Sequence, residues 1–312
     1  MAVYSTSRMI RILGTVFAGL FGLAFGSFLN VCLSRWPEGE SVVHPHSHCR
    51  NCDHTLSWWE NIPLVSWIAL RGRCRNCYDL IGWRYPMVEL AVAALWGSVA
   101  WSFPVNVLDP SLPRVALYDS LLTSLGLLVF YWLLIALAVL DAEYLWLPNR
   151  LTLPGVAAGF LISVFSFIVA VKLDSIGRSP LHPGFQYMRG ELWDVAWSRF
   201  IAIFVAAVLI LLIRWLYKLV RHQEGIGLGD AKLMAMLAAW LGLPGALLAF
   251  AMALLIGCFA ALILLFFPST RQDSTRWAGN KLPLGTFLCI GGIVSSLWGQ
   301  PMINAYLRWS GL

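Results

Sequence analysis

The stretch EGIGLGDAKLMAMLAAWLG, residues 224–242, decides how the chain is interpreted. Three glycines alternate with single residues, Asp230 follows at once, and an apolar run begins after Lys232. The run is apolar enough to enter a membrane. The stretch therefore places a carboxylate between flexible backbone and a membrane helix, and the rest of the sequence must explain its purpose.

The composition indicates a membrane protein. Of the 312 residues, 59% are hydrophobic and only 12% are charged, whereas about a quarter of a soluble domain is charged. The sequence therefore predicts an all-α polytopic membrane protein. Its basic residues are not interleaved with aromatic side chains in a soluble patch, so no nucleic-acid partner is expected.

Eight apolar runs approach the roughly 20 residues that a helix needs to cross a bilayer. The sixth and seventh are separated only by LGLPG, which contains the helix-breaking Pro244. In the first run, Ala18, Gly22 and Gly26 have the spacing of closely packed membrane helices. The expected spans are residues 12–34, 86–104, 119–140, 151–171, 200–217, 232–246, 247–267 and 284–304.

The distribution of Lys and Arg predicts the orientation. With eight spans, 14 of the 22 Lys and Arg residues fall on one side, which is then cytoplasmic. The polar loop 172–199 is then expected to face outward, and no role is assigned to it. The basic side consists of residues 35–85, 141–150, 214–232 and 269–282.

Residues 35–85 form the one long hydrophilic insertion, and they contain a tetracysteine pattern, C-x2-C-x21-C-x2-C. Two such pairs suit a tetrahedral zinc site that leaves no open position, so the ion would be structural. A redox dithiol or a disulfide is the alternative, but it is less compatible with the reducing cytosol. The nearby histidines could compete as ligands, but with four cysteines present they are expected to be surface groups or neighbours of the ligands. The predicted ligands are Cys49, Cys52, Cys74 and Cys77.

Two aspartates lie at span ends. Asp141 ends the third span and Asp230 opens the sixth, so counting crossings places both on the side of the cysteines. Two adjacent carboxylates can share one proton and hydrolyse a peptide bond without a covalent intermediate. Gly227 and Gly229 would leave room for an extended peptide substrate to approach. The alternative is that Asp230 merely caps a helix N-terminus.

Several motifs together resemble those of type IV prepilin peptidases along nearly the whole chain. They are GSFLNVCLSRWP, SVVHPHSHCRNC, ENIPLVSWIALRGRCRNC, RYPMVEL, LDAEYLWLPNRLTLP, EGIGLGDAKL and KLPLGTFL. One departure is Asn149, where the family often has Asp.

The resemblance implies a GxGD-type membrane aspartyl protease with Asp141 and Asp230 as the catalytic pair. It implies prepilin or pseudopilin substrates, whose short basic leader is removed at the cytoplasmic face, for pilus biogenesis or type II secretion. It also implies methylation of the new N-terminus by S-adenosylmethionine, whose binding residues are not identified. The domains would be the first helix (1–34), the cysteine domain (35–85) and the protease core (86–312). The oligomeric state is not predicted.

Two other functions are open at this point. In an ion-coupled carrier, intramembrane acids bind ions near the midplane, but these two acids lie at span ends and no inverted repeat is visible. A non-catalytic zinc-bearing scaffold would tolerate Asp141→Asn and Asp230→Asn but not the loss of its cysteines.

Overall fold

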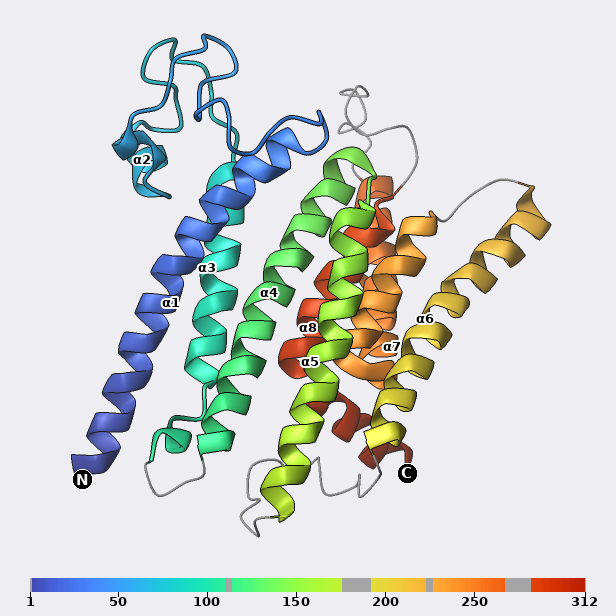
Figure 1. The fold of residues 1–312 in the computed structure, drawn as a ribbon. Coiled ribbons are helices and arrows are strands. Elements are labelled where there is room, and N and C mark those ends of the chain that lie inside the picture. Colours follow the sequence, from blue (N-terminus) through green and yellow to red (C-terminus); the bar gives the residue numbers. More distant parts are fainter. Residues whose placement is uncertain (1, 110–113, 176–191, 223–226, 267–281, 312) are drawn as a thin grey trace. The chain divides into compact units, whose positions relative to one another are not determined.

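The computed structural model describes residues 2–109, 114–175, 192–222, 227–266 and 282–311 (Figure 1). These residues form helices and no named strand, which confirms the all-α prediction. Two short 3-10 turns, Trp58–Asn61 and Val105–Leu108, accompany the helices. The helices are α1 (Ala2–Arg35), α2 (Val65–Ala69), α3 (Arg84–Ser102), α4 (Arg114–Tyr144), α5 (Asn149–Ser175), α6 (Leu192–Arg221), α7 (Leu228–Phe266) and α8 (Leu284–Ser310).

Among the described residues, six helices are long and apolar enough to cross a membrane, so the chain is a multi-pass membrane protein. The expected run 86–104 lies on α3, which is not one of the six. The expected run 232–246 and residues 247–266 of the next run lie together on α7, and residue 267 lies outside the described residues. The six candidates are Ser7–Arg35, Arg114–Tyr144, Asn149–Val169, Asp194–Arg221, Leu228–Ile263 and Leu284–Ser310.

Helix α7 is interrupted at Gly242, whose φ of 73° and ψ of 175° are not helical. A positive φ is readily adopted by glycine because it has no Cβ. The sequence places a break in LGLPG, and the structure places it at Gly242, two residues before the expected Pro244. Proline is tolerated in the first turn after such a break, since its missing N–H has no partner there.

One compact unit comprises residues 1–112 and 127–136. Its helices α1 and α3 pack through glycines, as the small-residue spacing predicts. A Cβ on Gly22 would lie 2.7 Å from the Cα of Ala93, and a Cβ on Gly26 would lie 2.7 Å from the Cα of Glu89. Trp132 of α4 donates its indole N–H to the backbone oxygen of Phe25 on α1 (3.3 Å).

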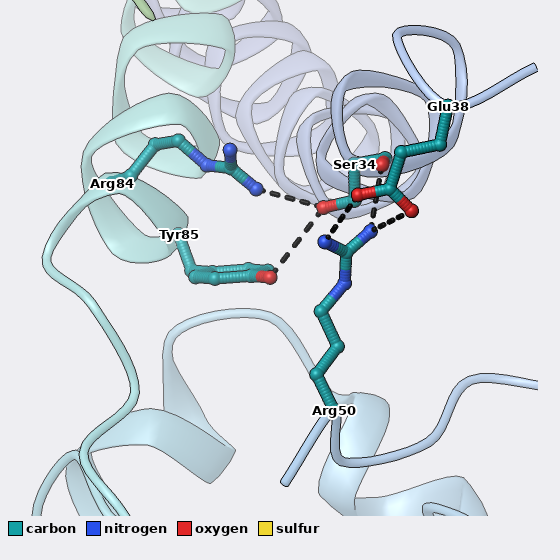
Figure 2. Close-up of polar contacts among 5 residues, drawn as sticks. All are labelled: Ser34, Glu38, Arg50, Arg84 and Tyr85. Atoms are coloured by element: carbon teal, nitrogen blue, oxygen red, sulfur yellow. Dashed lines mark hydrogen bonds and ion pairs between the residues drawn. The ribbon is translucent and has the colours of Figure 1, made fainter. Parts of the chain in front are cut away.

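A polar network fastens the cysteine-containing segment to both helices (Figure 2). Arg50 donates to the backbone oxygen of Ser34 (2.7 Å) and forms an ion pair with Glu38 (3.0 Å). Arg84, the first residue of α3, donates to the Ser34 hydroxyl (2.8 Å). The Tyr85 hydroxyl lies 3.5 Å from the same oxygen. Ser34 therefore connects the end of α1, the start of α3 and the first cysteine loop.

The second compact unit comprises residues 113–126 and 137–312, and in it α7 packs against α5, α6 and α8. Trp240 of α7 fits over Gly159 of α5 and donates its indole N–H to the backbone oxygen of Gly155 (2.9 Å). Leu137 and Leu140 near the end of α4, like Leu233 near the start of α7, are fully buried. The ends of α4 and α7 that carry the two aspartates are thus well packed.

Candidate active site

The four cysteines of the first unit come together as predicted. Their sulfur atoms all lie within 4.8 Å of one another. The Cys49 and Cys77 sulfurs are 3.8 Å apart, and those of Cys52 and Cys74 are 3.9 Å apart. Zinc–sulfur bonds of about 2.3 Å in a tetrahedron give an edge of roughly 3.8 Å. The cluster can therefore hold a metal ion such as zinc.

The two cysteine pairs form equivalent loops. Cys49 N–H donates to the His54 oxygen (2.9 Å), and Cys74 N–H donates to the Asp79 oxygen (2.8 Å). An isolated bridge closes each loop, His48 to Thr55 and Arg73 to Leu80. Repetition of CRNC in the sequence therefore reflects a repeated backbone shape. No histidine belongs to the cluster found among the described residues.

Hydrogen bonds to the cysteine sulfurs favour the thiolate form, which is the form that binds a metal cation. The His54 backbone N–H and the Asn76 amide lower the pKa of the Cys52 thiol to about 7. The Asp79 N–H also favours the Cys77 thiolate, but burial and the neighbouring sulfurs outweigh it and raise the pKa of Cys77 to about 12. Ionisation of Cys52 is thus favoured and that of Cys77 opposed, and a bound cation would compensate the negative charge of neighbouring thiolates.

Asp141 is buried at the end of α4, 5% exposed. Its Oδ2 accepts a hydrogen bond from the backbone N–H of Thr286 (2.7 Å) and lies 3.2 Å from the Thr286 hydroxyl. That hydroxyl has one proton and can donate it either to Oδ2 or to the Ala138 oxygen (3.0 Å). A Cβ on Gly285 would lie 2.9 Å from the Asp141 carboxyl carbon. Because residue 285 has no side chain, the backbone at the start of α8 can pack directly against the Asp141 carboxylate.

Asp230 is buried in the first turn of α7, 7% exposed. Its Oδ2 accepts a hydrogen bond from the backbone N–H of Gly227 (3.1 Å). Gly229 lies against Leu147, since a Cβ there would be 2.9 Å from the leucine Cβ. Gly225, the first glycine of the motif, lies outside the described residues.

Leu147 packs against the glycine next to Asp230 and against the glycine next to the Asp141 carboxyl group. Its Cδ1 would lie 3.1 Å from a Cβ on Gly229 and 3.0 Å from a Cβ on Gly285. Electrostatic repulsion from Asp141 acts on Asp230. The structure therefore brings the two predicted carboxylates together, although 88 residues separate them in the sequence.

A second contact ties the start of α7 to the start of α5. Lys232 donates from its ammonium to the side-chain oxygen of Asn149 (2.6 Å). Asn149, the departure from the family pattern, thus keeps an acceptor where an Asp would supply a charge. Sequence reasoning noticed both residues but did not pair them.

Three residues of the site are absent from the sequence-based prediction: Thr286, Gly285 and Leu147. The only signals for them were the motifs KLPLGTFL and LDAEYLWLPNRLTLP, which carried the family resemblance. Neither motif says which atoms meet, because a hydrogen-bonding Thr and a packing Leu have no distinctive pattern of their own.

Two family models match the chain. The Bacterial Peptidase A24 N-terminal domain matches residues 20–103, and the Type IV leader peptidase family matches residues 128–266. The first range contains all four cysteines, and the second contains both aspartates. No solved structure matches significantly.

Similar proteins cover almost the whole chain. A Prepilin leader peptidase/N-methyltransferase of Pseudomonas aeruginosa is 32% identical, over 94% of this chain and 93% of that protein. Those of Stutzerimonas stutzeri (30% identical; 94% and 93%) and Dichelobacter nodosus (34% identical; 92% and 92%) are similar over comparable lengths. With the buried aspartates and the cysteine cluster, these matches show that the chain belongs to the type IV prepilin leader peptidase/N-methyltransferase family.

Proposed function

We propose that Asp141 and Asp230 hydrolyse the peptide bond that joins a short basic leader to the apolar helix of a prepilin or pseudopilin. The observation that carries the proposal is a pair of buried carboxylates at helix ends, each held through Oδ2 by a backbone N–H. Fixed carboxylates that repel one another favour a state with one shared proton, which peptide hydrolysis by an aspartyl pair requires.

In the proposed reaction the pair acts as one acid and one base. The ionised carboxylate takes a proton from water, while the protonated one donates a hydrogen bond to the scissile carbonyl oxygen. The water oxygen bonds to the carbonyl carbon, the carbonyl oxygen takes the proton of the second carboxyl, and a tetrahedral diol forms. The carbon–nitrogen bond then breaks as a proton passes to the nitrogen, which leaves a leader carboxylate and a free amine. Because the pair titrates as a unit, the two roles are not assigned to one residue each.

The glycines admit the substrate in this proposal. Gly227 and Gly229 present backbone beside Asp230 without side chains. An extended peptide pairs through its main chain with such an edge. A helical segment must unwind to do this, because its own hydrogen bonds occupy its carbonyl oxygens.

The proposed topology has eight crossings, with the halves of α7 on either side of Gly242 counted separately and α3 included. Lys and Arg then place the aspartates and the cysteines on the cytoplasmic side of a bacterial inner membrane. The division into residues 1–34, 35–85 and 86–312 belongs to the same proposal. Four thiolates leave a zinc ion no open position, so its role would be structural.

The names of the similar proteins support a second activity, methylation of the newly formed N-terminus. S-adenosylmethionine would supply the methyl group, and the amine released by cleavage would receive it. We assign no residue to the methyl donor. This second proposal rests on family membership. The mature pilins or pseudopilins that the enzyme releases would then enter pilus assembly or type II secretion.

The test co-expresses the full chain with a prepilin in cells that lack their own peptidase. The mass of the pilin N-terminus is compared for the wild type, Asp141→Asn and Asp230→Asn. We expect leader loss with the wild type only, and the added mass of one methyl group on the mature pilin. An intact leader with well-expressed wild type and several prepilins would contradict the protease. Cleavage by either Asn variant would contradict the aspartyl pair.

A further inference from the structure

The insertion between α1 and α3 is not polar throughout. Residues 61–70 (NIPLVSWIAL) contain no charged side chain. Val65 and Ile68 lie three positions apart on α2, and therefore on one face of the helix. They are 59% and 67% exposed, and Ile62 just before them is 36% exposed. We call residues 62–69 the apolar segment.

A hydrogen bond fixes the apolar segment alongside the helix pair. The Leu64 N–H, at the start of α2, donates to the Glu89 carboxylate (2.8 Å). Glu89 lies five residues into α3, about 7 Å along its axis. Its Cα faces Gly26, nine residues and about 13 Å before the end of α1. Gly26 belongs to the candidate span Ser7–Arg35. The start of α2 is therefore level with the spanning part of α1, not beyond its end.

Aromatic contacts hold the other end of α2 beside the residue that precedes α3. The Trp67 ring lies 4.5 Å from the ring of Trp83, the residue just before α3. The Trp67 indole also donates to the Ile81 oxygen (3.2 Å). In Figure 1, α2 lies at the level of the first turns of α3. Tryptophan is enriched where a helix enters a membrane.

The charged residues that follow α2 are also those expected at a membrane surface. Arg71 and Arg73 follow the apolar segment after Leu70, and both are exposed. Arginines beside an apolar face bind phosphate groups of anionic lipids while the apolar side chains enter the acyl region. An exposed apolar face level with a spanning helix and bordered by arginines matches a lipid boundary.

We propose that the apolar segment lies in the membrane, with Ile62, Val65 and Ile68 inserted at the boundary between phospholipid headgroups and acyl chains. The cysteine domain would then rest on the bilayer through this face and not only through its two connections to helices. The inference does not depend on the protease or methyltransferase proposals, since it uses only contacts within one compact unit.

The experiment places a small fluorescent amino acid at Ile68 of the full chain by stop-codon suppression. A matched variant carries it at Tyr78, which is 69% exposed on the second cysteine loop, against 67% for Ile68. Each variant is reconstituted in phosphatidylethanolamine–phosphatidylglycerol vesicles. Quenching is measured with lipids brominated on the acyl chain and, separately, with aqueous iodide. A bound metal ion should protect the four cysteine thiols from an alkylating reagent, and this protection verifies that each variant is folded. If the Ile68 variant does not fold, the fluorescent amino acid is placed at Val65 instead.

We expect brominated lipid to quench the fluorophore at Ile68 several-fold more than at Tyr78, and iodide to show the opposite order. Iodide quenching at both positions, without lipid quenching at Ile68, would overturn the proposal because the segment would then face water. Shielding of Ile68 from both quenchers would also overturn it, because protein and not lipid would cover the face.

Discussion

Thr286 approaches Asp141 with two groups, its backbone N–H and its hydroxyl. The backbone bond survives any substitution except proline, whereas the hydroxyl can be removed alone. Asp141 is thus an acid whose orientation depends on a residue 145 positions later in the chain. No local pattern near Asp141 carries that information, so sequence could predict the carboxylate but not what holds it.

Replacement of Thr286 separates these contributions. Thr286→Val keeps the shape and the N–H but removes the hydroxyl beside Oδ2. A hydrogen bond to a charged group contributes about 1.5–3 kcal/mol, so we expect leader cleavage to slow by roughly tenfold or more. The loss should appear in kcat and not in KM. Thr286→Ser, which restores the hydroxyl, should recover most of the rate. Equal rates for Val and wild type would show that the hydroxyl does not act on Asp141.

Glu60 provides a pH-dependent contact in the cysteine domain. Burial opposes its charge, but the Ser57 N–H (2.8 Å) and His54 (3.6 Å) outweigh burial and lower the pKa of Glu60 below 4.5. A carboxyl group whose pKa is lower in the folded state stabilises the fold at pH values above its unfolded-state pKa. This stabilisation disappears as the pH falls through the folded-state pKa.

We therefore expect Glu60→Gln to destabilise the 3-10 turn by about 1 kcal/mol at pH 7. The difference from the wild type should shrink below about pH 4, where the wild-type carboxyl is also neutral. Hydrogen–deuterium exchange of residues 57–61 measures it, with both proteins at the same pH. A difference that stays constant from pH 7 to pH 4 would contradict the assigned role.

At the scale of elements, apolar runs predicted the long helices because a membrane chain must bury its backbone hydrogen bonds within helices. The break in α7 was expected from Pro244, but the structure places it at Gly242, where only the backbone angle identifies it. Helix α2 was missed for a different reason. Five residues give too little periodicity for a helix to be predicted from the sequence.

The pairing of α1 with α3 can be tested by one added methyl group. A Cβ on Gly26 would lie 2.7 Å from the Cα of Glu89, whereas a Cβ on Gly14 meets nothing within 4 Å. Backbone cannot yield as a flexible side chain does, so Gly26→Ala must separate the helices, at a cost of about 1–3 kcal/mol. We expect Gly26→Ala to lower the melting temperature of the purified chain and Gly14→Ala to leave it unchanged or higher. Equal melting of the two variants would contradict the close packing.

At the scale of the whole molecule, the cysteine spacing predicted the cluster of four cysteines almost completely, because each short C-x2-C loop brings its own two sulfur atoms together. The aspartate pair could not be predicted from local spacing, since its two members come from helices far apart in the sequence. Counting crossings predicted only their common side, and the packing of Leu147 against two glycines explains how they meet.

Metal content tests the tetracysteine site in the whole chain. We expect about one zinc ion per chain in the wild type and in Cys258→Ser, whose cysteine is exposed and outside the cluster. Cys52→Ser should lose the ion, because three thiolates bind it more weakly. Elemental analysis of the purified proteins measures this. Full metal content in Cys52→Ser, or none in the wild type, would contradict the site.

The most direct measurement of the central claim is leader cleavage by the purified full chain in lipid nanodiscs. A synthetic prepilin peptide is incubated with the wild type, Asp141→Asn, Asp230→Asn and Glu143→Gln. The last change makes the same carboxyl-to-amide replacement on an exposed residue two positions from Asp141. The aspartyl pair predicts cleavage by the wild type and Glu143→Gln, and none by the two Asn variants. Cleavage that survives either Asn change would show that the buried pair does not carry out the reaction.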